Sequence, residues 1–159
     1  MTKLSERIDL PRYSRPWEYL NRAVCQVSDY QEPEVIRLRV PLLGVTGGPA
    51  IEKDVAIKYS ARPAAAGDDR PWSLHWEPVG GGPYPEFAGE LKIDIGEDRA
   101  CALVIEGEYS PPLGAAGQAF DSLLGSRIAS VTAREFLAAI AEQMHHEHVL
   151  QEAMDIQPH

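Results

Sequence analysis

Three polar residues could carry acid, base or anion-binding chemistry, namely Tyr109, His75 and Arg127. A general acid or base has to stand within hydrogen-bond reach of the proton that it transfers, inside a substrate cavity. Tyr109 lies on the inward phase of a strand pattern, whereas His75 does so only if its strand is shifted by one residue. Arg127 could reach a carboxylate or phenolate, although it is more typical of a solvent-facing side chain. Tyr59 could also orient a ligand, but these residues form no complete catalytic set, so we predict no catalytic residue.

A second chemical candidate is the histidine-rich segment near the C-terminus, with His145, His146 and His148. His145 and His148 are three residues apart on one helix face, a spacing that would suit two metal ligands. Further ligands at a suitable spacing are lacking, and the helix dipole favours imidazoles near a helix C-terminus in any case. The glycine-rich segment 80–85 is followed by neither Lys-Ser/Thr nor a helix, so it is no phosphate-binding loop. We therefore predict no metal and no cofactor, and a hairpin at 80–85 that could cover a pocket.

Composition limits the partners. The formal net charge is −9, and a nucleic-acid partner is disfavoured because phosphate binding needs clustered Lys and Arg. No apolar stretch is long enough to predict a membrane span, and the first residues lack the apolar core of a secretory signal, so we expect a cytoplasmic protein. In that reducing compartment Cys25 and Cys101, which both lie in apolar segments, are expected to be buried thiols.

Alternating apolar and polar residues predict five strands within segments 35–42, 51–60, 72–77, 87–95 and 101–109. The first two should pair as a hairpin through the turn at 45–49, and segment 61–71 should be an irregular excursion. Gly89 and Gly107 fall on inward phases of their strands, where a side chain would be expected. Nearer the N-terminus, Leu4, Ile8 and Leu10 indicate a first strand. A short helix is expected to begin at 14–16, where Pro16 suits a first turn.

After residue 112 the apolar period becomes helical and predicts a helix from Gly117 to His146. Thr132 and Glu135 match a capping box, so the segment could be two helices, but we favour one because no Gly or Pro interrupts it. The residues that should be buried against the sheet share its apolar stripe: Phe120, Leu124, Ile128, Leu137 and Ile140. We predict a single domain over residues 1–150 and a short, polar and frayed tail over residues 151–159.

This order of elements is that of the helix-grip fold, and the sequence resembles the SRPBCC superfamily, also called START-like, which includes polyketide cyclase and dehydrase relatives. The resemblance lies in LHWEP at 74–78, YPEFAGEL at 84–91 and EGEYSPPLG at 106–114, followed by the helical segment 120–141. It implies an α+β fold in which a curved antiparallel sheet wraps a long C-terminal helix. It also implies an apolar cavity of the kind used for lipids, sterols, hormones or polyketides, but no shared catalytic residues. The N-terminal region departs from the family because it is short for the usual pair of helices.

A binding cavity is expected where small residues meet between sheet and helix. Gly89 and Gly107 would face Ala116, Ala119 and Ala129 of the helical region, which leaves volume unfilled. The residues predicted to line that space are Trp76, Phe87, Leu91, Ile105, Tyr109, Phe120, Leu124 and Arg127. Because protein interiors are normally packed without voids, the same residues could instead fill a core.

The prediction for function is binding or carriage of an apolar small molecule, such as a lipid, an aromatic compound or a polyketide-like compound. Two alternatives stay open. The first is an enzyme of the cyclase or dehydrase type that acts on such a ligand. The second is a protein-interaction module with a filled core, whose partner surface would be marked by exposed Trp17, Trp72 or Tyr84. An enclosed cavity, and a titratable group facing into it, would separate the three; the sequence leaves the oligomeric state open.

Overall fold

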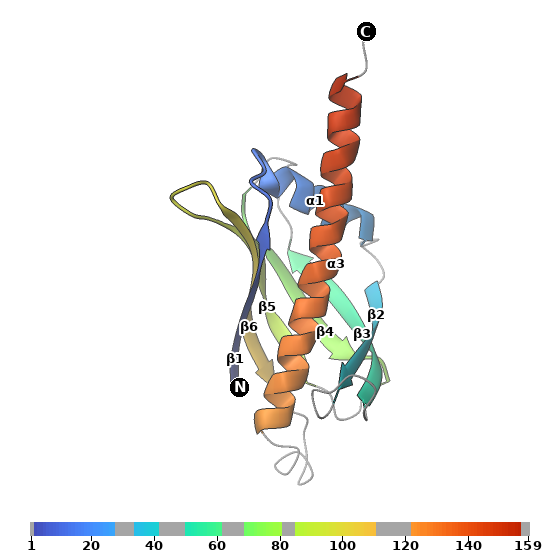
Figure 1. Ribbon diagram of the computed structural model, residues 1–159. Coiled ribbons are helices and arrows are strands. Elements are labelled where there is room, and N and C mark those ends of the chain that lie inside the picture. Colours follow the sequence, from blue (N-terminus) through green and yellow to red (C-terminus); the bar gives the residue numbers. More distant parts are fainter. Residues whose placement is uncertain are drawn as a thin grey trace.

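The computed structural model confirms the predicted α+β class and the helix-grip arrangement of a curved antiparallel sheet with a long C-terminal helix (Figure 1). It describes residues 2–27, 34–41, 50–61, 69–80, 85–110 and 122–156. The elements in chain order are β1 (Thr2–Leu10), α1 (Pro16–Val27), β2 (Glu34–Pro41), β3 (Ala50–Ala61), β4 (Trp72–Pro78), β5 (Glu86–Ile95), β6 (Cys101–Ser110) and α3 (Ser122–Ile156). The described helices include no stretch apolar and long enough to cross a bilayer.

The six strands form one sheet in the order β1-β6-β5-β4-β3-β2, and every neighbouring pair is antiparallel. Strands β2 to β6 pair in sequence order, which confirms the predicted hairpin of the first two alternating segments. The N-terminal strand β1 pairs with β6, so the first and last strands lie side by side at one edge of the sheet. Strand β2 forms the other edge.

Directly opposed residues of neighbouring antiparallel strands point to the same side of the sheet. The inward-pointing residues that are opposed across successive strands therefore form rows that run across the inner face. Counted from the start of β1, the first row holds Ile57, Trp76, Phe87 and Tyr109, the second Tyr59, Leu74, Gly89, Gly107 and Leu4, and the third Trp72, Leu91, Ile105 and Glu6. The predicted strand phases are thus confirmed for β4, β5 and β6. The alternation within segment 87–95 also predicts an inward side chain for Ile95 at the end of β5, but Ile95 is exposed.

Helix α3 is continuous, as favoured, and spans Ser122–Ile156, so it extends beyond its predicted end at His146. The predicted start at Gly117 lies outside the described residues. The Thr132 hydroxyl does not cap a second helix; it donates a 2.7 Å hydrogen bond to the carbonyl of Ile128 one turn earlier. The helix continues past His146 because no Gly or Pro follows until Pro158. The tail expected to be frayed is therefore helical up to Ile156, and Met154 within it is an exposed apolar residue.

The apolar stripe of α3 faces the sheet. Ile128, Leu137 and Ile140 are buried as predicted, together with Phe136 and Met144. The helix contacts β1 and β6 at one edge of the sheet and β2 at the other, so it bridges the concave face (Figure 1). Its C-terminal part extends beyond the strands and packs against α1.

Helix α1 begins at Pro16, as predicted from the proline at its first turn. It is joined to the sheet by a buried hydrogen bond of 2.9 Å, which the indole N–H of Trp72 donates to the Asn21 side-chain oxygen. Trp72 is only 1% exposed, so the suggestion that it marks an exposed partner surface was wrong. Trp17 is half-buried, and Tyr84 lies outside the described residues. The bond to Asn21 satisfies the polar atom of a large side chain, which explains how a tryptophan can be buried in the core.

Candidate functional site

The predicted ligand-lining residues of the sheet lie together in the core. Trp76, Phe87 and Tyr109 are neighbours in one cross-strand row and are 0%, 1% and 4% exposed. The rings of Trp76 and Phe87 are stacked, with centroids 4.2 Å apart and planes inclined by 19°. The Trp76 indole N–H donates a 3.2 Å hydrogen bond to the Pro85 carbonyl, which satisfies the polar atom of this buried side chain.

The space expected over Gly89 and Gly107 is filled. The two glycines are directly paired across β5 and β6. A Cβ atom at Gly107 would lie 2.7 Å from Cζ of Phe87 and 2.6 Å from the Gly89 Cα atom, and it would also collide with the Ala88 carbonyl. The glycines are therefore required by close backbone approach and by the ring of Phe87, which corrects the prediction that small residues leave a void there.

The remaining predicted site residues are dispersed. Leu91 and Ile105 are buried in the third row, beside Trp72. Arg127 is exposed on α3. His75 alternates with the buried Leu74 and Trp76 and so lies on the opposite face of β4, away from the interior. Phe120 lies outside the described residues, as do Ala116, Ala119 and the side chain of Leu124.

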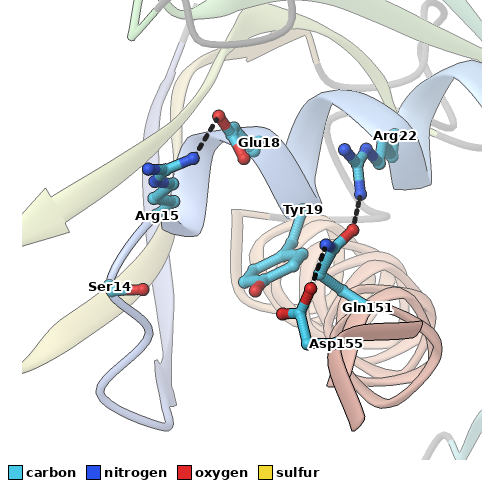
Figure 2. A pocket seen from close by; sticks show the side chains of 7 residues that line it. All are labelled: Ser14, Arg15, Glu18, Tyr19, Arg22, Gln151 and Asp155. Carbon is cyan, nitrogen blue, oxygen red and sulfur yellow. Dashed lines mark hydrogen bonds and ion pairs between the residues drawn. The ribbon is translucent and has the colours of Figure 1, made fainter. Parts of the chain in front are cut away.

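A polar cleft that the sequence did not reveal lies between α1 and the C-terminal end of α3. Its volume is about 470 Å³. Figure 2 shows its lining, in which Arg15 and Arg22 stand at opposite ends with Tyr19 between them. Among the described residues, the lining consists of Ser14, Arg15, Glu18, Tyr19, Arg22, Gln151 and Asp155. The α1 residues recur at helical spacing, so one face of α1 forms one wall of the cleft.

The charges of this cleft are loosely paired. Arg15 and Glu18 approach to 3.7 Å, and the Arg15 side chain is 69% exposed. Arg22 donates a 3.2 Å hydrogen bond to the side-chain oxygen of Gln151, whose amide nitrogen in turn donates a 3.3 Å bond to Asp155. Arg22 and Asp155 are therefore joined through a neutral amide instead of forming an ion pair.

Beneath the cleft, Tyr19 belongs to a hydroxyl–imidazole–carboxylate chain. Its hydroxyl lies 3.2 Å from Nδ1 of His148, and Nε2 of His148 lies 3.2 Å from a Glu152 carboxylate oxygen. The rings of Tyr13 and Tyr19 both pack against the imidazole. These contacts on both ring nitrogens orient His148, and they hold the Tyr19 hydroxyl in place beside the cleft.

His148, which was considered as a metal ligand but not predicted to be one, contacts two tyrosine rings and a carboxylate. His145 and His146 are exposed on α3. Within the described part of the chain, no three His, Cys, Asp or Glu side chains gather as a metal-binding group. Sequence reasoning missed the contact between Tyr19 and His148 because these residues are 129 positions apart in the sequence.

Tyr13 offers a test of this cluster. Its hydroxyl is buried and has no hydrogen-bond partner among the described residues. Burial raises the pKa of Tyr13 above its ordinary 10.0, and the neighbouring Tyr19 and Cys101 raise it further. The folded protein thus holds this proton more tightly than the unfolded chain. The resulting contribution to the free energy of unfolding is complete below the ordinary pKa and is lost as the pH rises through the raised one.

We expect Tyr13→Phe to leave the free energy of unfolding unchanged at neutral pH or to raise it by about 1 kcal/mol, because it removes an unsatisfied buried hydroxyl. The variant should also lose less stability than the natural protein above pH 10. Urea unfolding followed by circular dichroism at neutral and alkaline pH measures both effects. Tyr19→Phe is the matched control and should cost about 1 kcal/mol at neutral pH, since it removes a hydrogen bond. An equal cost for Tyr13→Phe would contradict the assignment.

No family model and no curated protein sequence matches this chain. Among solved structures, TTHA0849 from Thermus thermophilus has a similar fold, with a TM-score of 0.53 and 12% sequence identity over 92% of this chain and 99% of that one. DynU16, a protein in the dynemicin biosynthetic locus, gives a TM-score of 0.42 and 15% identity over 90% of this chain and 47% of that one. At such identities the likeness to TTHA0849 concerns the fold alone.

Proposed function

We propose that this protein is a member of the SRPBCC superfamily that binds or carries an apolar small molecule between its sheet and α3. The ligand would be a lipid, an aromatic compound or a polyketide-like compound. The observation that carries the proposal is the aromatic row of Trp76, Phe87 and Tyr109 on the inner face of the sheet. Flat apolar rings in one row offer a surface against which a planar or aliphatic ligand can pack.

The position of α3 supports this proposal. The helix contacts the edge strands β1 and β2 and also β6 beside β1, whereas β4 and β5 carry the large buried side chains Trp72, Trp76 and Phe87. Side-chain rotation can open such a layer more readily than a direct helix–sheet backbone contact. Because the rings are almost fully buried, a ligand has to displace the side chains that cover them. Binding should therefore change the environment of Trp76.

The placement of the candidate acids and bases favours binding over catalysis. His75 lies on the outer face of β4, and Arg127 is exposed on α3. Of the three nominated residues, only Tyr109 lies on the inner face. A single buried tyrosine beside stacked rings suits ligand orientation, whereas proton transfer needs a group positioned and tuned for it.

The test uses the indole N–H signals of Trp76 and Trp72, which lie on the same face of β4, four residues apart, with different hydrogen-bond partners. We expect 2-naphthol and decanoate, as aromatic and aliphatic probes, to shift the Trp76 signal saturably in proton–nitrogen correlation spectra. The Trp72 signal should shift much less, because Trp72 lies two rows further along the sheet. Trp76→Phe and Trp72→Phe assign the two signals.

Equal, non-saturating shifts of both indoles would indicate non-specific adsorption and would count against the proposal. The same holds if neither probe moves the Trp76 signal while the protein stays folded. If the probes shift only the backbone amide signals of residues that line the polar cleft between α1 and α3, they bind in that cleft and not beside the aromatic row.

A further inference from the structure

The cleft between α1 and α3 lies at the other end of the molecule from the aromatic row. Tyr109 of that row pairs with Thr2 at the start of β1, whereas α1 follows the end of β1 (Figure 1). A ligand in this cleft would therefore be independent of the proposed apolar site. The described residues of its lining include two arginines and two carboxylates, so their charges sum to zero and favour neither a simple anion nor a simple cation.

The Gln151 amide shows what chemistry the cleft can accept. Its oxygen faces the guanidinium of Arg22 and its nitrogen faces the carboxylate of Asp155, at 3.2 and 3.3 Å (Figure 2). Both bonds are long for their type, and each joins a charged group to a neutral one. No carboxylate among the described residues pairs with Arg22, and no basic side chain among them pairs with Asp155.

An α-amino acid head group presents the same two functions a similar distance apart, with a carboxylate as acceptor and an ammonium group as donor. Both groups are charged, so each would form an ion pair with Arg22 or Asp155 in addition to a hydrogen bond, whereas the neutral amide of Gln151 offers the hydrogen bond alone. We propose that this cleft binds a small zwitterion with the carboxylate–ammonium spacing of an α-amino acid, whose head group displaces the amide of Gln151. Its side chain would extend along α1 toward Glu18 and Ser14, which line the rest of the cleft.

The probes are L-alanine, N-acetyl-L-alanine and L-alaninamide, which carry both charges, the negative charge alone and the positive charge alone. Each is titrated at millimolar concentrations into the full-length chain while backbone amide signals of residues 14–22 and 151–155 are followed. L-Alanine should shift these signals saturably, and the other two should bind at least tenfold more weakly, because each leaves one charge of the cleft without a partner.

Matched substitutions locate the site. Arg22→Gln and Asp155→Asn should each weaken L-alanine binding at least tenfold, whereas Gln151→Ala should strengthen it because the competing amide is gone. Arg12→Gln and Asp98→Asn change the charge by the same amounts at an exposed ion pair outside the cleft, and both should leave binding unchanged. Asp155 is exposed near the end of α3, so Asp155→Asn tests the site without endangering the fold.

Several results would overturn the proposal. Equal binding of N-acetyl-L-alanine would indicate an anion site, and equal binding of L-alaninamide a cation site. Absence of saturable shifts with all three probes, weaker binding in Gln151→Ala, or equal effects of Arg22→Gln and Arg12→Gln would also exclude it. None of these outcomes depends on whether the aromatic row binds an apolar ligand.

Discussion

Replacing Gly107 by leucine is expected to unfold the domain or to lower its free energy of unfolding by more than about 3 kcal/mol, at or beyond the upper end of overpacking costs. A Cβ at this position collides with the Ala88 carbonyl and lies 2.6 Å from the Gly89 Cα atom, and both belong to the paired strand. The backbone of β5 cannot move away from Gly107 without breaking the hydrogen bonds that pair β5 with β6. Even Gly107→Ala should therefore be destabilising by a clear margin.

Gly96→Ala is the matched control. It lies in the β5–β6 turn, and its added Cβ would meet the Asp98 side chain at 3.3 Å, with the Ala100 carbonyl no closer than 3.7 Å. A small shift of one exposed side chain relieves that contact, so we expect a change within about 0.5 kcal/mol. Urea unfolding of the three variants at neutral pH gives the comparison. If Gly107→Ala is as stable as Gly96→Ala, the two glycines do not approach each other as described.

The phases of the strands could be predicted because alternation directly reports which side chains share a face. Trp72, Leu74 and Trp76 are inward and His75 is outward, as the pattern indicates. Whether the space over Gly89 and Gly107 is empty or filled could not be predicted in the same way. An inward glycine tells only that a Cβ is missing, and what occupies the space depends on the rotamer of Phe87, two residues away from Gly89 on the same face.

The polar cleft was beyond sequence reasoning for a different reason. Its two walls lie at opposite ends of the chain, at residues 14–22 and 151–155. Their approach depends on how far α3 continues and on how α1 packs against it, and neither is encoded in a local pattern. The helix was expected to end at His146, which would have removed Gln151 and Asp155 from any ordered wall. Local periodicity thus located the core, whereas the cleft required the tertiary packing of two helices.

Replacing Phe87 by alanine should lower the free energy of unfolding by about 3–5 kcal/mol, the usual cost of deleting a buried phenylalanine ring. The ring of Phe87 stacks on Trp76 and covers Gly89 and Gly107. Since the glycines have no side chains that could collapse into the vacated space, the cavity should persist and the loss should lie at the upper end of that range. Phe136→Ala is the control, because Phe136 is equally buried but belongs to the stripe of α3.

The cavity left by Phe87→Ala should also be dry and apolar, because its neighbours on the sheet are Trp76 and Tyr109 in the same row and Leu74 in the next. We therefore expect benzene to raise the free energy of unfolding of Phe87→Ala by mass action, and to raise it more than that of the natural protein, in which the ring of Phe87 occupies this space. Urea unfolding with and without benzene measures this difference. If Phe87→Ala costs no more than Phe136→Ala and benzene has no effect, the space over the glycines closes when the ring is removed. If benzene stabilises the variant, the aromatic row borders a volume that an apolar ligand can occupy once Phe87 moves, which is the step that the proposed binding function requires.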